Sequence, residues 1–95
     1  MYSAQMKITF DPVKNERNIR ERGLPFHLVE GFDWHSALVE KDTRKSYPEM
    51  RYETIGFIDG RLFVVIFTPA AEGVRVISFR KANQREVKRY EKTQS

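Results

Sequence analysis

Four arginines lie on or beside segments that are predicted to form strands, and they are the residues best suited to chemistry in this sequence. Arg51 and Arg61 belong to neighbouring segments in the middle of the chain, and Arg75 and Arg80 belong to a later one. A guanidinium is permanently charged and offers paired donors that match a phosphate. Several converging arginines could therefore bind an RNA backbone and stabilise the extra negative charge of a phosphoryl transition state.

Cleavage of RNA without a metal also needs a base that takes the proton of the 2′-hydroxyl and an acid that protonates the leaving oxygen. Glu49, His27, His35 or a lysine could serve in either role, and the residues alone do not choose among them. Ordinary structural roles compete with these. Arg51 between Glu49 and Glu53 is placed for ion pairs on a solvated face. His27 fits a surface or helix-capping position, and His35 fits a strand residue with a local hydrogen bond.

The sequence lacks the patterns of several other kinds of active site. It has no cysteine, so neither a disulfide framework nor a thiolate metal site is available. His27 and His35 stand on different predicted elements, and there is no HExxH pair, glycine-rich phosphate loop or GxSxG elbow. We therefore expect no metal site and no cofactor.

The chain is basic, with 17 Lys and Arg against 13 Asp and Glu, a net charge of +4 and a pI of about 9.6. The excess favours a polyanionic partner such as nucleic acid, an acidic protein or an acidic membrane surface, although it also fits an ordinary solvated surface. No segment approaches the ~20 apolar residues of a membrane span. The N-terminus lacks the basic start and apolar run of a signal peptide, so we expect a cytoplasmic protein without membrane association.

The apolar periodicities predict the elements that must position these residues. Strands are expected over 7–10, 34–40, 50–58, 61–68 and 74–79, and helices over 12–21, from Pro25 to Phe32 and over 84–92. Asp59-Gly60 tolerates positive φ and predicts a hairpin turn. The run LFVVIF after the turn is apolar at every position, which is typical of a central strand buried on both faces.

Capping signals delimit the helices. Asp11 precedes Pro12 at the start of the first helix, and Gly23 follows its end. Asn83 with Glu86 forms a capping-box pattern for the last helix. The first helix has few apolar residues, chiefly Val13 and Ile19, so we expect it on the surface. Val87 and Tyr90 are the inward candidates of the last helix, and the large aromatic residues, Trp34 included, are expected in the core rather than as a base-stacking platform.

These elements predict an α+β fold: an N-terminal strand, a two-helix hairpin, an antiparallel meander of about four strands and a short C-terminal helix. The 95 residues suit one domain, expected over 6–92, with 1–5 as an N-terminal extension and 93–95 as a frayed tail. Strand alternation would place Arg75 and Arg80 on opposite faces of the sheet unless the strand bends between them.

Three stretches of the chain, in order, resemble the BrnT family of toxins, and together they cover most of residues 6–90. They contain Phe10, Asp11, Lys14, Asn18, Gly23 and Phe26; then Asp42, Arg44, Glu49, Arg51, Tyr52, Ile55 and Gly56; then Arg75, Val76, Ile77, Ser78, Arg80, Ala82, Glu86 and Tyr90. The chain departs from the family at two places. Arg22 precedes Gly23 where the family often has histidine, and Thr68 is followed by Pro69 where many members have arginine.

The resemblance implies a RelE-like fold and RNA cleavage, alone or on the ribosome, that halts translation. It also implies a BrnA antitoxin, a ribbon-helix-helix protein that covers the toxin. The toxin would bind operator DNA only through this antitoxin. Mapped onto this chain, the implied catalytic residues are Arg51 and Arg80 with Glu49 in support. The implied RNA contacts are Lys14, Arg22 and Arg75. The two departures leave a second hypothesis open, that the chain is a degenerate module that only binds RNA or its antitoxin. A third hypothesis is that the chain is an unrelated small basic protein.

Overall fold

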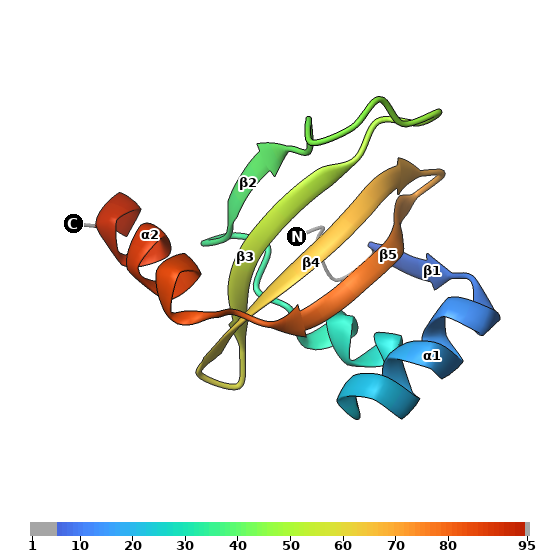
Figure 1. The fold of residues 1–95 in the computed structure, drawn as a ribbon, viewed down its shortest axis with the longest axis horizontal. Coiled ribbons are helices and arrows are strands. Elements are labelled where there is room, and N and C mark those ends of the chain that lie inside the picture. The colour runs from blue at the N-terminus through green and yellow to red at the C-terminus, as the bar shows by residue number, and fades with distance from the viewer. Residues whose placement is uncertain (1–5, 95) are drawn as a thin grey trace.

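The computed structural model describes residues 6–94, and it confirms the α+β class with a five-stranded mixed sheet and helices (Figure 1). The elements are β1 (Lys7–Phe10), α1 (Pro12–Arg22), the 3-10 helix η2 (Phe26–Gly31), β2 (Leu38–Lys41), β3 (Tyr52–Ile58), β4 (Arg61–Ala70), β5 (Gly73–Lys81) and α2 (Gln84–Gln94). The expected N-terminal extension, 1–5, and Ser95 lie outside the described residues. No helix within the described part is long and apolar enough to cross a membrane.

The strands lie in the order β1-β5-β4-β3-β2. Each consecutive pair from β2 to β5 is antiparallel, and β1 pairs in parallel with β5. We expected about four meander strands, and the sheet has five because β1 joins it at the β5 edge. The hairpin turn at Asp59-Gly60 is confirmed, since both residues have positive φ, 47° and 78°.

Of the two helices predicted before the meander, the first is the α-helix α1 and the second is η2, a 3-10 helix of six residues. The backbone N–H of Leu28 donates to the carbonyl of Pro25 at 3.2 Å. Three residues per turn place Phe26, Val29 and Phe32 above one another, so all three are buried. Their spacing of three in the sequence is the period of a 3-10 helix, and it is shorter than that of an α-helix.

The first meander strand is shorter than predicted, since β2 begins at Leu38 and not at Trp34. The carboxylate of Asp33 accepts hydrogen bonds from the backbone N–H of His35 at 3.1 Å and from Ser36 Oγ at 2.8 Å. These bonds close a turn where the strand was expected. Trp34 packs edge-on against Phe32 and Phe67 in the core. Likewise, β3 begins at Tyr52, two residues after the predicted start.

The two faces of the sheet are covered unequally. On one face, called here the covered face, η2 and Leu24 pack on Phe63, Val65, Phe67, Val74, Val76 and Phe79. The opposite face, called here the open face, carries the alternate residues of β4, Leu62 to Thr68. There α2 packs only at one end, where Val87 and Tyr90 contact Ile55, Leu62 and Val64. The rest of the open face is available for polar side chains.

Polar contacts attach α1 to the sheet. Its predicted caps are confirmed, since Asp11 accepts from the N–H of Val13 and Gly23 ends the helix at φ 69°. Val13 and Ile19 are 67% and 36% exposed. The buried residue is Asn18, whose Nδ2 donates to the carbonyl oxygens of Leu24 at 2.8 Å and Phe79 at 2.9 Å. A buried amide therefore anchors α1 beside β5.

The capping box of α2 is confirmed. Asn83 Oδ1 accepts from the N–H of Glu86, and Glu86 Oε1 accepts from the N–H of Asn83, both at 2.8 Å. The helix ends at Gln94, two residues beyond the predicted end, so Thr93 and Gln94 of the expected frayed tail are helical. Tyr90 is buried as predicted, and its hydroxyl donates to the carbonyl of Ser36 at 2.9 Å. This bond ties α2 to the turn before β2.

Candidate functional site

Arg75 and Arg80 lie on the same face of the sheet. In the register of β4 with β5, Arg80 pairs with Val64 and Arg75 pairs with Thr68. The two β4 residues are four apart and share the open face, so their partners do too. The register shifts between Ile66 and Phe67, which leaves Ile77 as an extra residue of β5. This β-bulge is the bend between Arg75 and Arg80 that places both side chains on one face, where regular alternation would separate them.

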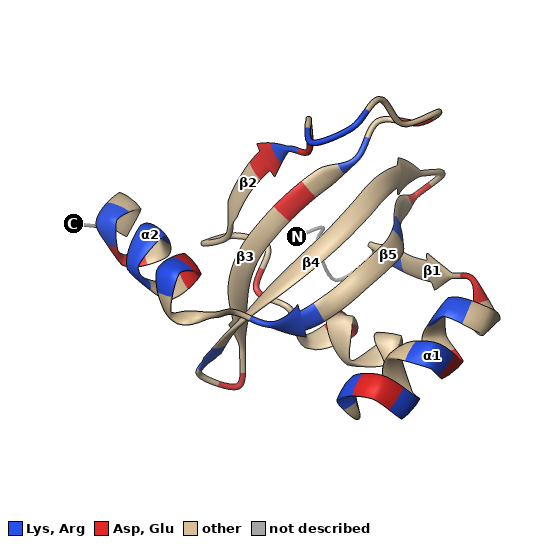
Figure 2. Ribbon diagram, viewed as in Figure 1, with Lys and Arg blue, Asp and Glu red and all other residues tan. Residues whose placement is uncertain are grey.

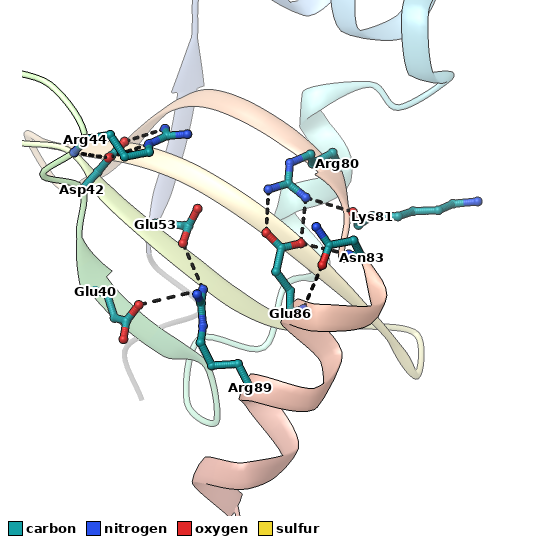
Figure 3. A network of polar contacts seen from close by, with 9 residues as sticks. All are labelled: Glu40, Asp42, Arg44, Glu53, Arg80, Lys81, Asn83, Glu86 and Arg89. Carbon is teal, nitrogen blue, oxygen red and sulfur yellow. Dashed lines mark hydrogen bonds and ion pairs between the residues drawn. The ribbon is translucent and has the colours of Figure 1, made fainter.

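A carboxylate from α2 orients Arg80. Arg80 Nη1 donates to Glu86 Oε1 at 2.8 Å and Nη2 donates to Glu86 Oε2 at 2.7 Å (Figure 3). These bonds raise the pKa of Arg80 and lower the pKa of Glu86. Among the described residues, the hydrogen bonds of Arg80 come from Nη1 and Nη2, and none comes from its Nε–H. Nε–H and the outer N–H of Nη2 therefore form a donor fork that an anion can occupy.

Further charged side chains lie over the same face, among them Glu53, Arg89, Glu40 and Arg44 (Figure 3). Glu53 of β3 accepts a hydrogen bond from Arg89 Nη2 of α2 at 3.1 Å. Arg80 interacts electrostatically with both Glu53 and Arg44. Arg44 stands in the segment between β2 and β3 and is 62% exposed. Arginines from a loop, a strand and a helix thus lie around Glu53, and Arg89 also lies 3.9 Å from the carboxylate of Glu40 on β2.

Asp42 holds Arg44 in place. The carboxylate of Asp42 accepts from Arg44 Nε at 2.9 Å, from Arg44 Nη2 at 2.8 Å and from the backbone N–H of Arg44 at 3.2 Å. The hydrogen bond to the Arg44 guanidinium lowers the pKa of Asp42 to about 2. Asp42 is buried while the Arg44 guanidinium reaches solvent, so a buried anion fixes an accessible cation.

Arg51 and Glu49, two of the predicted catalytic residues, pair with each other. Arg51 Nε donates to Glu49 Oε2 at 2.9 Å, and the guanidinium lies 4.2 Å from the ring centre of Tyr47. Arg51 immediately precedes β3 rather than belonging to it. The ion pair with Glu49, considered above as the structural alternative, is present. The catalytic assignment of both residues remains a prediction.

Lys14 and Arg22, two of the predicted RNA contacts, lie together on α1. With Arg17, Ile77 and Ser78 they line a hollow of about 260 Å³ beside β5. Ile77 and Ser78 belong to β5, so the hollow borders the strand that carries Arg75 and Arg80. Figure 2 shows basic positions on both α-helices, at the end of β5 and in the loop after β2. Basic side chains therefore follow β5 on more than one side.

The two histidines lie elsewhere. His27 is exposed on η2, which packs on the covered face. His35 is exposed in the turn before β2 and lines a separate hollow with Trp34 and Glu30. Within residues 6–94, neither histidine forms a hydrogen bond or ion pair with the charged residues around Arg80. In the same range, no group of three or more His, Cys, Asp and Glu is arranged to hold a metal ion.

Sequence reasoning missed three members of the charged group and one role. Arg44, Glu53 and Arg89 were not singled out as site residues, and Glu86 was interpreted only as a helix cap. The spacing of Glu86, Arg89 and Tyr90 is a usable signal, because residues three and four apart share a helix face. Tyr90 was already expected to point inward, so Glu86 and Arg89 are placed on the same side of α2.

Fold and site together define a small basic α+β domain with an arginine-lined sheet face suited to bind a phosphodiester. Residues 10–86 match the family model described as the ribonuclease toxin BrnT of type II toxin–antitoxin systems. The match spans most of the chain, so the chain belongs to the BrnT family of ribonuclease toxins. No curated protein matches the chain. The matched range contains Arg44, Glu53, Arg75, Arg80 and Glu86.

Proposed function

We propose that this toxin is an endoribonuclease that cleaves RNA without a metal ion on the open face of the sheet and thereby inhibits translation. The observation that carries the proposal is the geometry of Arg80, whose guanidinium is fixed by Glu86 and keeps a free donor fork. A pre-oriented arginine stabilises transition-state charge without reorganising during the reaction. Arg80 would bind the scissile phosphate, and Arg44 and Arg89 would add positive charge around it.

Glu53 is the best-placed proton acceptor. Its Oε1 accepts from Arg89, while its Oε2 has no hydrogen bond from any described residue. Both oxygens of Glu86 already accept hydrogen bonds, and its lowered pKa makes it a weak base. In the proposed reaction Glu53 takes the proton of the 2′-hydroxyl and the 2′-oxygen attacks phosphorus. The bond to the 5′-oxygen then breaks, and water protonates that oxygen at this exposed face.

The remaining predicted residues take supporting places. Arg51, with Glu49, is proposed to act with Arg80, although its Nε is already occupied by that carboxylate. Removal of Arg51 is therefore expected to cost less activity than removal of Arg80. Lys14, Arg22 and Arg75 are proposed to contact the RNA backbone beside the scissile phosphate.

The antitoxin partner follows from membership of a type II toxin–antitoxin family. We propose that a BrnA-type ribbon-helix-helix protein neutralises the toxin in the cytoplasm, and that the pair binds operator DNA through the antitoxin. The exposed cations of the open face favour an acidic antitoxin segment as its cover. A RelE-like arrangement of the fold is part of the same proposal.

A catalytically degenerate binding module is the second candidate. Arg22 stands where the family often has histidine, and Pro69 stands where many members have arginine. Both departures remove groups that could serve in cleavage. A degenerate module would bind RNA with strong salt dependence, because phosphate contacts release counterions, and it would cleave none.

Incubation of the purified chain with labelled RNA in excess EDTA tests the proposal. Wild type is expected to cleave, Arg80→Ala and Glu53→Gln to lose about 100-fold or more in rate, and Arg51→Ala to lose less. Arg61→Ala is the matched control, because it removes the same charge from an exposed position on the β3–β4 hairpin. Absence of cleavage by folded wild type, with RNA binding retained, would support the degenerate module instead.

A further inference from the structure

Arg75 differs from the other arginines of the open face because no described carboxylate lies within ion-pair distance of it. Arg44, Arg80 and Arg89 each pair with an acidic side chain, and Arg51 pairs with Glu49. Arg75 is partly exposed and stands near the start of β5, an inner strand of the sheet. A strand-borne guanidinium that lacks a counter-ion within the described chain is a ready site for an external anion.

Two hydroxyl side chains flank Arg75. In the sheet register Arg75 pairs with Thr9 of β1 on one side and with Thr68 of β4 on the other. Directly paired residues point to the same face, so both threonines lie on the side of Arg75, where Thr9 is partly exposed and Thr68 is buried. Thr9 Oγ1 donates to the carbonyl of Val74 at 3.3 Å, a long bond. Threonine hydroxyls are common phosphate contacts in nucleic-acid complexes.

The Arg75 position is separated from Arg80 along the strand. Their β4 partners, Thr68 and Val64, are four residues apart, which corresponds to about 13 Å in an extended strand. Glu86 also holds the Arg80 guanidinium at the α2 end of β5. A phosphate bound at Arg75 therefore belongs to a different nucleotide from the phosphate bound at Arg80.

The surface between the two arginines suits one extended strand of RNA. Ser78 and its partner Ile66 occupy the intervening row of the open face. A single strand can follow β5 from one arginine to the other, whereas the phosphates of an A-form duplex wind away from a sheet surface. The β-bulge at Ile77 is what makes this possible, because it turns Arg75 onto the face of Arg80.

We propose that Arg75, with the partly exposed Thr9 beside it, forms a second phosphate subsite that binds a non-scissile phosphate of single-stranded RNA. The subsite depends on the proposed function, because it is defined relative to a scissile phosphate at Arg80. It sets a minimum substrate length: a dinucleotide with one phosphate occupies Arg80 alone, and a longer strand also reaches Arg75.

Binding of uncleavable RNA strands tests the subsite. The strands carry 2′-deoxyribose at the cleavage position, and a series of them replaces one phosphate at a time by a neutral methylphosphonate. A neutral methylphosphonate at one particular position, distinct from the cleavage site, is expected to weaken binding to the wild type about tenfold. In Arg75→Ala the same replacement should have no effect, while Arg61→Ala should behave as wild type. Arg75→Lys keeps the charge and is expected to retain part of the effect.

Two further readouts separate the subsite from general charge. The salt dependence of binding should fall in Arg75→Ala by about one phosphate contact, a change of roughly 0.7 in the slope for single strands. Duplex RNA of the same sequence should bind more weakly and lose little affinity in Arg75→Ala. If wild type cleaves RNA but Arg75→Ala weakens the binding of every methylphosphonate strand by the same factor, the proposed subsite is wrong and the proposed function stands. If folded wild type neither binds nor cleaves RNA, both are wrong.

Discussion

Arg80 and Glu86 form a two-bond ion pair that joins the end of β5 to the first turn of α2, with N–O distances of 2.8 and 2.7 Å. The same carboxylate caps α2 through the backbone N–H of Asn83. Glu86 therefore connects the docking of a helix to the orientation of the arginine proposed to bind the scissile phosphate.

Glu86 is expected to act as a positioning residue. Glu86→Gln keeps a side chain suitable for the capping box. It loses the negative charge and one of the two oxygens that accept hydrogen bonds from Arg80. We expect kcat for RNA cleavage to fall about tenfold with little change in KM, because mobile Arg80 still attracts RNA but is misaligned in the transition state. In an Arg80→Ala background the same substitution should have no further effect on kcat. An equal loss in both backgrounds would show that Glu86 contributes only to folding.

Asn18 is expected to be a main determinant of stability in α1. Asn18→Ala leaves the buried carbonyls of Leu24 and Phe79 without their donor, so we expect the free energy of unfolding to fall by about 2–3 kcal/mol. Denaturant unfolding followed by circular dichroism measures this change. Ile19→Ala is the comparison, because Ile19 is 36% exposed on the same helix and should change stability much less. Comparable losses in the two variants would contradict the anchoring role.

Acid sensitivity is expected from Asp42. Its folded-state pKa of about 2 is below the usual ~3.9 of an aspartate, because Arg44 donates hydrogen bonds to it. A lowered carboxylate pKa stabilises the fold above the unfolded pKa, and this contribution is lost as the pH falls from about 4 to about 2. Asp42→Asn should therefore be less stable than wild type at pH 7, and the difference should shrink over that window. Urea unfolding at pH 7, 4, 3 and 2 would show this; a constant difference would contradict it.

Gly56 is expected to be required for the packing of Phe32. A Cβ at position 56 would lie 2.6 Å from Phe32 Cζ and 3.1 Å from the Cβ of Ala37. Gly56→Ala should therefore destabilise the fold by about 1–3 kcal/mol through overpacking. Combining it with Phe32→Leu should recover part of that loss, because the smaller side chain vacates the contact. Strictly additive losses in the double variant would refute this packing relation.

Local signals in the sequence were sufficient for several features of the fold. Asp59-Gly60 favours positive φ and gives the β3–β4 turn, Asp11-Pro12 starts α1, and Asn83 with Glu86 caps α2. The continuous apolar run of β4 predicted a strand buried on both faces. These features depend on neighbouring residues along the chain, so sequence reasoning reached them. The Phe26, Val29 and Phe32 spacing also held as a buried stripe, although its period of three belongs to a 3-10 helix.

The sequence by itself determined the basic charge, the α+β class, the caps and the strand positions of Arg75 and Arg80. Only the tertiary structure decided that these two arginines share a face, because an extra residue in β5 is defined by its pairing with β4. It also decided that Glu86 orients Arg80 and that Glu53 lies among Arg44, Arg80 and Arg89. Such relationships join side chains that are distant along the chain, and they exist only once the strands are in register and α2 is docked.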